Sequence, residues 1–141
     1  MALTTDDKVA IQELLARRNQ GADFADPDAW AATWATDGVL ELPEGTVLNM
    51  PNGPTMDPRI AGRDNLRAFV ASLLPQLDGS RHWINSIVID GDGESAHSIC
   101  YFSLVNVETG GTPVHTGIYY DTHIKIDGEW LTQHRRVTFD L

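Results

Sequence analysis

The chain has 141 residues, 42% of them hydrophobic and 21% charged, which is typical of a soluble domain with its own core. We therefore expect a single domain over residues 1–141. The net charge of −10 would repel phosphate backbones and anionic lipid, so it argues against nucleic acid and membrane surfaces as partners. No apolar run approaches the roughly 20 residues that span a bilayer.

Two further features bear on location. Residues 1–10 lack the basic flank and apolar stretch of a signal peptide. Cys100 is the one cysteine, so no disulfide can form within the chain, and a reducing compartment fits this cysteine usage. We expect a cytoplasmic protein in which Cys100 is a core thiol.

The first predicted element is a helix from Thr4 or Thr5 to about residue 22. Either threonine can cap the helix, and the two aspartates that follow place negative charge in its first turn. Apolar residues then recur at helical spacing, and Arg18 and Ala22 lie near the same face.

A second, short helix is predicted directly after the first. Asp26 fits its cap and Pro27 its first helical position. Trp30 and Trp34 would then stack one turn apart. The helix would end at an Asp-Gly pair, before a strand over residues 38–43.

The next segment, residues 43–62, contains four prolines and predicts a long loop. Its apolar residues, Met56 among them, are too many for a free linker, and we interpret it as a flap over the body of the domain. Helical spacing returns from Arg63, and Pro75 limits the end of this third helix.

Four strands are predicted in the remaining chain, separated by the short turns GDGE, TGG and DG. They cover residues 81–90, 95–108, 112–127 and 129–140, and we expect them to form an antiparallel meander. Helices followed by a meander indicate the α+β class, with the helices packed on one face of the sheet.

The strand that begins near residue 82 is apolar on both faces. One face can cover the helices, and the other then needs a partner. We therefore expect a homo-oligomer, with a trimer favoured over a dimer. Simple alternation assigns four residues to each face: His82, Ile84, Ser86 and Val88 to one, and Trp83, Asn85, Ile87 and Ile89 to the other.

The standard motifs of cofactor and metal sites are absent. There is no GxGxxG after a strand, no phosphate-binding loop, no GxSxG and no HExxH. We expect neither a metal nor a cofactor, because no two histidines have the short spacing of familiar metal sites. The histidines are His82, His97, His115, His123 and His134.

Asp23 and His82 have the clearest potential for chemistry. Asp23 ends the first helix beside small and aromatic neighbours, and His82 stands at a strand entrance. Each also has a structural interpretation, as a helix-end aspartate and as a strand histidine bonded to a backbone carbonyl. If the two meet, the carboxylate would fix the imidazole tautomer and raise its basicity, and the other ring nitrogen could remove a proton.

Three segments carry a wider pattern: ELLARRNQGADFADPDAWAATWATDGVLE, then RIAGRDNLRAFV, then RHWINSIVIDGDGESAHSICYFSLVN with GIYYDTHIKIDGEWLTQHRRV. In this order they are similar to the SnoaL-like branch of the nuclear-transport-factor-2-like superfamily. The resemblance implies a cone, with helices folded against a strongly curved antiparallel sheet and a pocket inside. The shared features are the acids Asp23, Asp26, Asp28 and Asp37, the Gly62-Arg63 helix entry, the Arg81-His82 strand start, Gly117-x-Tyr119-x-Asp121 and Gly128-x-Trp130.

Within that family the chain is similar to scytalone dehydratase, bile-acid dehydratase and hexachlorocyclohexane dehydrochlorinase. These enzymes eliminate water or hydrogen chloride with an Asp–His dyad and no cofactor, and Asp23 and His82 match that dyad. The resemblance implies a cofactor-independent, dehydratase-like lyase or an isomerase that acts on a small apolar cyclic or aromatic substrate. The alternative is a non-catalytic ligand-binding or structural subunit that resembles the β subunit of ring-hydroxylating dioxygenases.

The chain departs from that pattern in two respects. Where the dehydratases carry a tyrosine on the first helix, this chain offers Ala22 and Arg18. The cation of Arg18 could bind a leaving group or an enolate oxygen, or could form a salt bridge. Val105 takes the place of the second pocket histidine of scytalone dehydratase, which puts the dehydratase reaction itself in doubt.

Tyrosines elsewhere could supply the missing hydroxyl. Tyr119 should share a strand face with Asp121 and His123. Tyr101 is a further candidate, and both tyrosines could instead be core aromatics. The predicted substrate-binding residues are Arg18, Tyr119, Tyr101, Trp34 and Met56.

Overall fold

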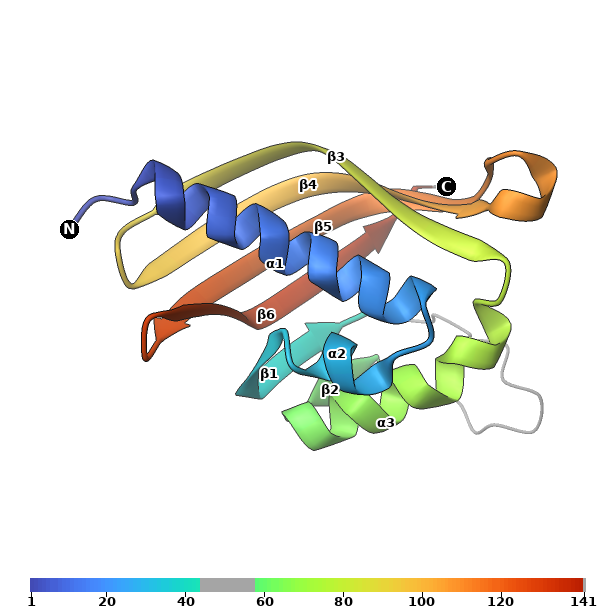
Figure 1. Cartoon of the computed structure of the whole chain (residues 1–141), viewed down its shortest axis with the longest axis horizontal. Helices are drawn as coiled ribbons and strands as arrows, with labels where there is room; N and C mark the ends of the chain where they lie inside the picture. The colour runs from blue at the N-terminus through green and yellow to red at the C-terminus, as the bar shows by residue number, and fades with distance from the viewer. Residues whose placement is uncertain (44–57, 141) are drawn as a thin grey trace.

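The computed structural model describes residues 1–43 and 58–140. Long strands form one curved sheet, and helix α1 lies across one of its faces (Figure 1). The described elements are α1 (Thr5–Asp23), α2 (Pro27–Ala31), β1 (Trp34–Glu41), β2 (Arg59–Ala61), α3 (Arg63–Leu73), β3 (Ser80–Gly91), β4 (Ser95–Asn106), β5 (Thr112–Ile126) and β6 (Glu129–Phe139), with short 3₁₀ turns at Leu74–Gln76 and Val107–Thr109.

The sheet has six described strands in the order β2-β1-β6-β5-β4-β3. Strands β3 to β6 form the predicted antiparallel meander. The sheet is nevertheless mixed, because β1 pairs with β6 in parallel. Strand β1 lies between β2, with which it pairs antiparallel, and β6, the last strand of the chain. The predicted α+β class is confirmed, while the expectation of a wholly antiparallel sheet is corrected by the β1–β6 pair.

Helix α1 starts and ends where its sequence predicts. Thr4 and Asp7 form a capping box, in which each side chain bonds the other's backbone N–H. The Asp7 carboxylate also accepts hydrogen bonds from Trp130 Nε1 at 2.9 Å and Lys125 Nζ at 3.1 Å. These bonds, led by that of the Thr4 backbone, hold the pKa of Asp7 well below its usual range. The start of α1 is thereby attached to the β5–β6 hairpin.

The second helix is shorter than predicted. It ends at Ala31, and Trp34 already belongs to β1, so the two tryptophans do not share a helix. The chain leaves the helix at Thr33, whose hydroxyl donates to the Trp30 carbonyl while its own carbonyl accepts from the Thr132 N–H of β6. The rings still pack, with centroids 5.5 Å apart.

Strand β3 contains a bulge that the predicted alternation did not include. Its pairing with β4 shifts between Asn85 and Val88, and Ser86 adopts a left-handed φ of 53°. Before the bulge the even-numbered residues point inward, as His82 does. After it the odd-numbered residues do, so that Ile89 is buried and Val88 is 61% exposed. The two predicted faces are therefore correct up to Asn85 and wrong beyond it, because the bulge adds one residue to β3.

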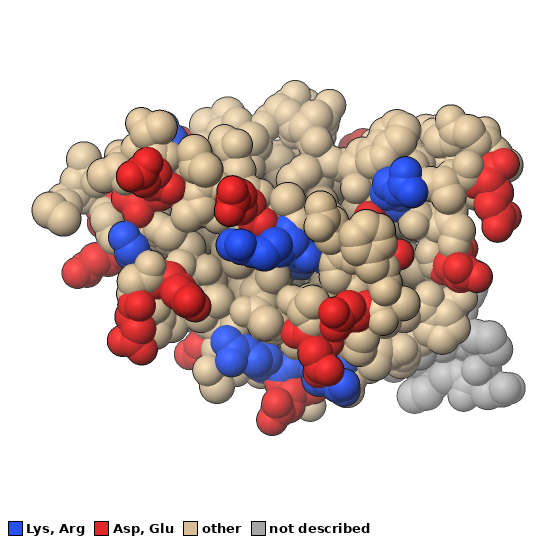
Figure 2. All heavy atoms as spheres, viewed as in Figure 1, with Lys and Arg blue, Asp and Glu red and all other residues tan. Residues whose placement is uncertain are grey.

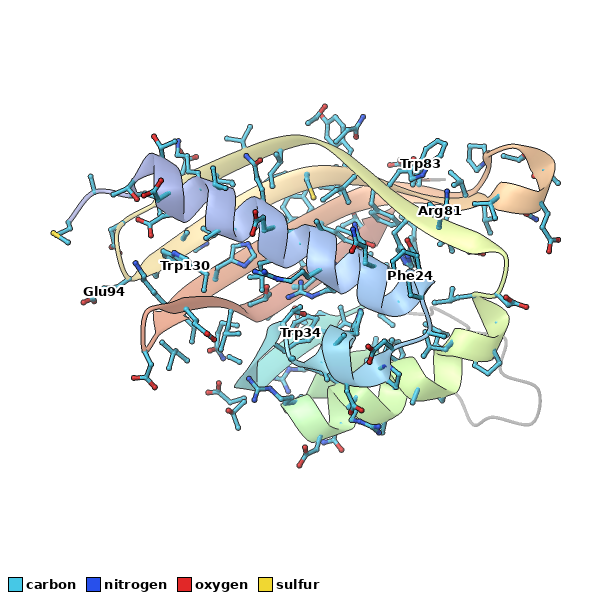
Figure 3. All side chains as sticks on the ribbon, in the orientation of Figure 1. Phe24, Trp34, Arg81, Trp83, Glu94 and Trp130 are labelled. Carbon is cyan, nitrogen blue, oxygen red and sulfur yellow. The ribbon has the colours of Figure 1, made fainter. Side chains whose placement is uncertain are left out.

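The outer face of β3 and β4 is apolar. Trp83 points away from the helices, whereas Trp34 lies beneath α1 (Figure 3). Trp83, Val88, Ile99 and Tyr101 are each between 46% and 61% exposed. No helix in the described ranges is long and apolar enough to cross a membrane.

Helix α3 closes the end of the sheet near β1. Arg63, at its first position, donates through its guanidinium to the Trp34 carbonyl, which ties the start of α3 to the start of β1. The inner face of α3 buries Leu66, Phe69 and Val70 against the tryptophans of α2 and β1. Most of the predicted flap, including Met56, lies outside the described residues; its end forms β2.

Candidate active site

A cavity of about 630 Å³ lies between the helices and the inner face of the sheet. This volume is within the range of small-molecule sites, roughly 300–1,000 Å³. Its wall is mostly apolar, with side chains from α1, α3 and each strand from β3 to β6. Polar side chains interrupt it, among them Arg18, His82, His115, Tyr119 and Arg135.

The structure brings Asp23 and His82 into contact. Asp23 is the last residue of α1, and His82 is near the start of β3. The imidazole Nδ1 is 2.7 Å from Asp23 Oδ1, and the His82 backbone N–H donates to both carboxylate oxygens at 3.1 Å. Both side chains are largely buried, at 17% exposure for His82 and 9% for Asp23. The Asp23 carboxylate therefore binds both the backbone near the start of β3 and the imidazole ring of His82.

The contact with Asp23 uses Nδ1 of the His82 ring and leaves Nε2 as the other ring nitrogen. An ionised carboxylate only accepts hydrogen bonds, so Nδ1 of His82 donates in this contact. Nε2 of His82 is then unprotonated in the neutral ring and can accept a proton. His82 also lines the cavity, so an imidazole that contacts a carboxylate stands at its wall.

The floor of the cavity holds a buried ion pair. Arg135 of β6 donates to Asp121 of β5 through Nε and Nη2, both at 2.8 Å, and the two side chains are at most 7% exposed. Burial alone would raise the pKa of Asp121, but the charge and hydrogen bonds of Arg135 hold that pKa below its ordinary value. The Arg135 guanidinium lies 3.7 Å from the centre of the Tyr119 ring, which stacks on Phe102.

Tyr119 is a poor proton donor in this position. Burial is the main cause that raises the pKa of its hydroxyl, to about 12. Tyr119, Asp121 and His123 are all buried on one strand face, as their alternation predicted. Burial also raises the pKa of the Cys100 thiol, to about 11, and Cys100 is a core residue as expected.

Arg18 lies deep beside the same floor, 1% exposed. It donates from Nε to the Thr33 hydroxyl at 2.8 Å, and from Nη2 to the Thr33 carbonyl at 3.1 Å and to the Thr132 hydroxyl at 2.6 Å. Its guanidinium carbon is 4.3 Å from the centre of the Trp34 ring. Burial, and then repulsion from Arg135, lower the pKa of Arg18 to about 9. The sequence left open whether Arg18 forms a salt bridge. It forms none among the described residues.

The predicted site residues divide into three groups. Arg18, Trp34, His82 and Tyr119 line the cavity, and Asp23 contacts His82 from the end of α1. Tyr101 does not line it: its side chain is 52% exposed on the outer face of β4, because neighbouring strand residues alternate. Met56 lies outside the described residues.

The structure adds two residues that the sequence did not single out. Arg135 lines the cavity through its pair with Asp121, and His115 lines it near Phe139, with ring centroids 5.4 Å apart. His115 could have been found from strand pairing, because His82 lies opposite Leu104, and Leu104 opposite His115.

A second hollow, of about 640 Å³, lies on the other side of α1, between α1, α2 and the β5–β6 turn. It includes Arg17 and Glu129 but neither member of the Asp23–His82 pair. On the helical face of the molecule acidic and basic side chains are intermixed, and no continuous basic surface is visible there (Figure 2). In the described part of the chain no three His, Cys, Asp or Glu residues gather as metal ligands would.

A family model described as a SnoaL-like domain matches residues 4–136. Among solved structures, a protein of unknown function with a cystatin-like fold from Nostoc punctiforme is 28% identical, with a TM-score of 0.84; the match covers 99% of this chain and 96% of that one. Among curated proteins nothing matches.

Two more distant structures share the fold. A protein from Novosphingobium aromaticivorans, provisionally described as a scytalone dehydratase, is 19% identical with a TM-score of 0.74, over 96% of this chain and 85% of that one. The structure of LinA is 15% identical with a TM-score of 0.76, over 96% of this chain and 87% of that one. At these identities the likeness is one of fold.

Proposed function

The chain belongs to the SnoaL-like domain family, and we propose that it is a cofactor-independent lyase or isomerase that uses Asp23 and His82 as its general-base dyad. The observation that carries this proposal is the 2.7 Å contact between Asp23 Oδ1 and His82 Nδ1, with the ring on the wall of a cavity of about 630 Å³. The mostly apolar wall favours a small apolar molecule, cyclic or aromatic in shape.

In the proposed reaction, His82 Nε2 takes a proton from an acidic C–H bond of the substrate. The electron pair of that bond forms a carbon–carbon double bond, and Asp23 stabilises the imidazolium that results. In an elimination the leaving group departs with its own bonding pair and accepts the proton from His82. In an isomerisation the proton returns to a different carbon. Arg18 or Tyr119 stabilises the negative charge that develops.

The alternative, a structural or ligand-binding subunit without catalysis, is less well supported. It predicts a pocket filled by side chains, or an aspartate and histidine that are far apart. The open cavity and the short Asp23–His82 contact favour catalysis instead.

Proton removal can be tested without the natural substrate. We would measure deuterium exchange at the acidic carbon of tetralone by NMR and the ring opening of nitrobenzisoxazole by absorbance, because both report a positioned base. His82→Ala and Asp23→Asn should lower the rates by about 10²–10⁴-fold while the circular dichroism spectrum stays unchanged.

His97→Ala is the matched control. His97 is exposed and faces away from the cavity, on the outer side of β4, so its loss should leave both rates unchanged. If His82→Ala keeps the wild-type rate with both probes, His82 is not the base and the proposed mechanism is wrong.

A further inference from the structure

Two buried hydrogen-bond donors in the described structure have no partner, and both belong to residues of the cavity wall. They are Nη1 of Arg18 and Nε1 of Trp34. A buried donor that is left unsatisfied destabilises the folded chain, and more strongly when it is charged. The two residues are adjacent, since the Arg18 guanidinium lies over the Trp34 ring. An acceptor brought by a ligand would satisfy both.

The surrounding hydrogen bonds fix the position of Arg18. Its Nη2 donates to the Thr132 hydroxyl, which therefore has its own hydrogen free for His123 Nδ1, 3.0 Å away. His123 must then carry its proton on Nε2, which lies 2.8 Å from the Ser98 hydroxyl. With Nε held by Thr33, only Nη1 of the guanidinium remains unused. The network thus holds Arg18 in place and leaves one side of its guanidinium unpaired.

The buried charges near the floor do not balance. Arg135 and Asp121 neutralise each other, and the partners of Arg18 are uncharged oxygens of Thr33 and Thr132. No carboxylate in the described ranges contacts Arg18. Its pKa of about 9 keeps it protonated at neutral pH. A buried cation without a counter-ion is costly, and an anionic ligand group would offset that cost.

We propose that Arg18 and Trp34 form a subsite for an anionic oxygen of the substrate, which makes the substrate class a cyclic ketone that reacts through its enolate, or a phenol. This inference rests on the proposed function and extends it. Arg18, Trp34 and His82 line the same cavity. One ring-sized ligand in it can therefore contact both the base and the oxygen subsite. Both donor atoms are buried in the unliganded chain, so the subsite requires that ligand binding brings the oxygen into contact with them.

The subsite can be tested by binding, with benzoate as the anionic probe and benzamide as its neutral counterpart of similar shape. Titration calorimetry should show that the wild-type chain binds benzoate at least about tenfold more tightly than benzamide. The net charge of −10 opposes this preference, so a local site must produce it.

Two variants test whether Arg18 and Trp34 cause the preference for benzoate over benzamide. Arg18→Met keeps the length of the side chain and should abolish the preference for benzoate. Trp34→Phe removes the Nε1 donor and should weaken benzoate binding about tenfold, with little effect on benzamide. Arg17→Met is the matched control, because Arg17 is exposed on the same helix and lines only the second hollow.

The outcome is separable from that of the proposed function. His82→Ala should bind benzoate as the wild type does, even though proton removal is lost. A wild-type chain that binds the two probes equally, or a Trp34→Phe variant with unchanged benzoate affinity, overturns the subsite, whatever the role of His82. Trp34→Phe decides the matter if Arg18→Met does not fold, because a phenyl ring keeps most of the packing.

Discussion

The two faces of the sheet depart from the usual distribution of side chains in opposite ways. The inner face buries the Arg135–Asp121 ion pair and the neutral ring of His123 among its apolar residues, whereas the outer face exposes large apolar side chains such as Trp83 and Tyr101. In most antiparallel sheets the buried face is apolar and the exposed face is polar. The usual arrangement is the one that favours the folding of a single chain. Each departure from it therefore indicates a role beyond folding.

The inner face is organised for a ligand at a cost in stability. Buried ion pairs gain little over well-packed apolar residues, but removing one partner is strongly destabilising. We expect the outer face to contact another surface, because apolar side chains in a group seldom remain in water. Variants on the inner face should therefore lower the stability of one chain, and variants on the outer face should change its association.

The largest expected effect is at the buried ion pair. Asp121→Asn leaves the Arg135 guanidinium buried without a counter-charge, and we expect it to lower the free energy of unfolding by about 3–5 kcal/mol in urea titrations. Asp28→Asn is the matched control. Asp28 pairs with Arg67 on the surface, where both side chains are exposed, and its loss should lower the free energy of unfolding far less. Equal losses in the two variants would contradict the difference between the faces.

The same ion pair shows what the sequence could and could not predict. Alternation correctly placed Tyr119, Asp121 and His123 on one face. Regular pairing outward from the Asp-Gly turn would set Asp121 opposite His134. A register shift between Thr122 and His123 sets it opposite Arg135 instead. Such an irregularity depends on three-dimensional packing and leaves no mark in a hydrophobic pattern.

The contact between Asp23 and His82 followed from the family resemblance, since no local pattern relates residues 59 positions apart. Helix α1 was predicted almost to the residue, because its cap and spacing are local signals. The second helix was predicted too long, because the pairing of Trp34 with β6 is a tertiary contact that overrides local spacing.

The second prediction concerns the pH dependence of stability. Burial is the main cause that lowers the pKa of His123 from 6.5 to about 4. Between these values the unfolded chain binds a proton that the folded chain does not, so His123 makes the free energy of unfolding fall as the pH drops from 6.5 to 4. Its contribution to that fall is about 3 kcal/mol.

A difference measurement isolates this group. His123→Gln keeps a donor and an acceptor but cannot titrate, and its stability should fall less steeply than that of the wild type over the same pH range in urea titrations. If His123→Gln and the wild type have parallel profiles, the buried ring does not resist protonation.

The third prediction tests the bulge that determines which side chains reach each face. Ser86 has a left-handed φ of 53°, which glycine adopts without the steric cost that a Cβ atom brings. Ser86→Gly should therefore raise the free energy of unfolding by about 1 kcal/mol. Ser103→Gly, in a regularly paired part of β4, should lower it by a similar amount. A loss of stability in Ser86→Gly would mean that the bulge is not held in this conformation.

The smallest effect on the fold of one chain is expected on the outer face. Trp83 and Tyr101 are each 52% exposed, so the double variant Trp83→Ser, Tyr101→Ser should change the free energy of unfolding of the monomer by no more than about 0.5 kcal/mol. Association should change much more: we expect the wild type to scatter light as an oligomer at micromolar concentration and the double variant as a monomer. His97→Ser, polar and on the same face, should leave the oligomer intact. A monomeric wild type would show that the exposed apolar residues have no role in self-association. The proposed difference between the two faces would then hold for the inner face alone.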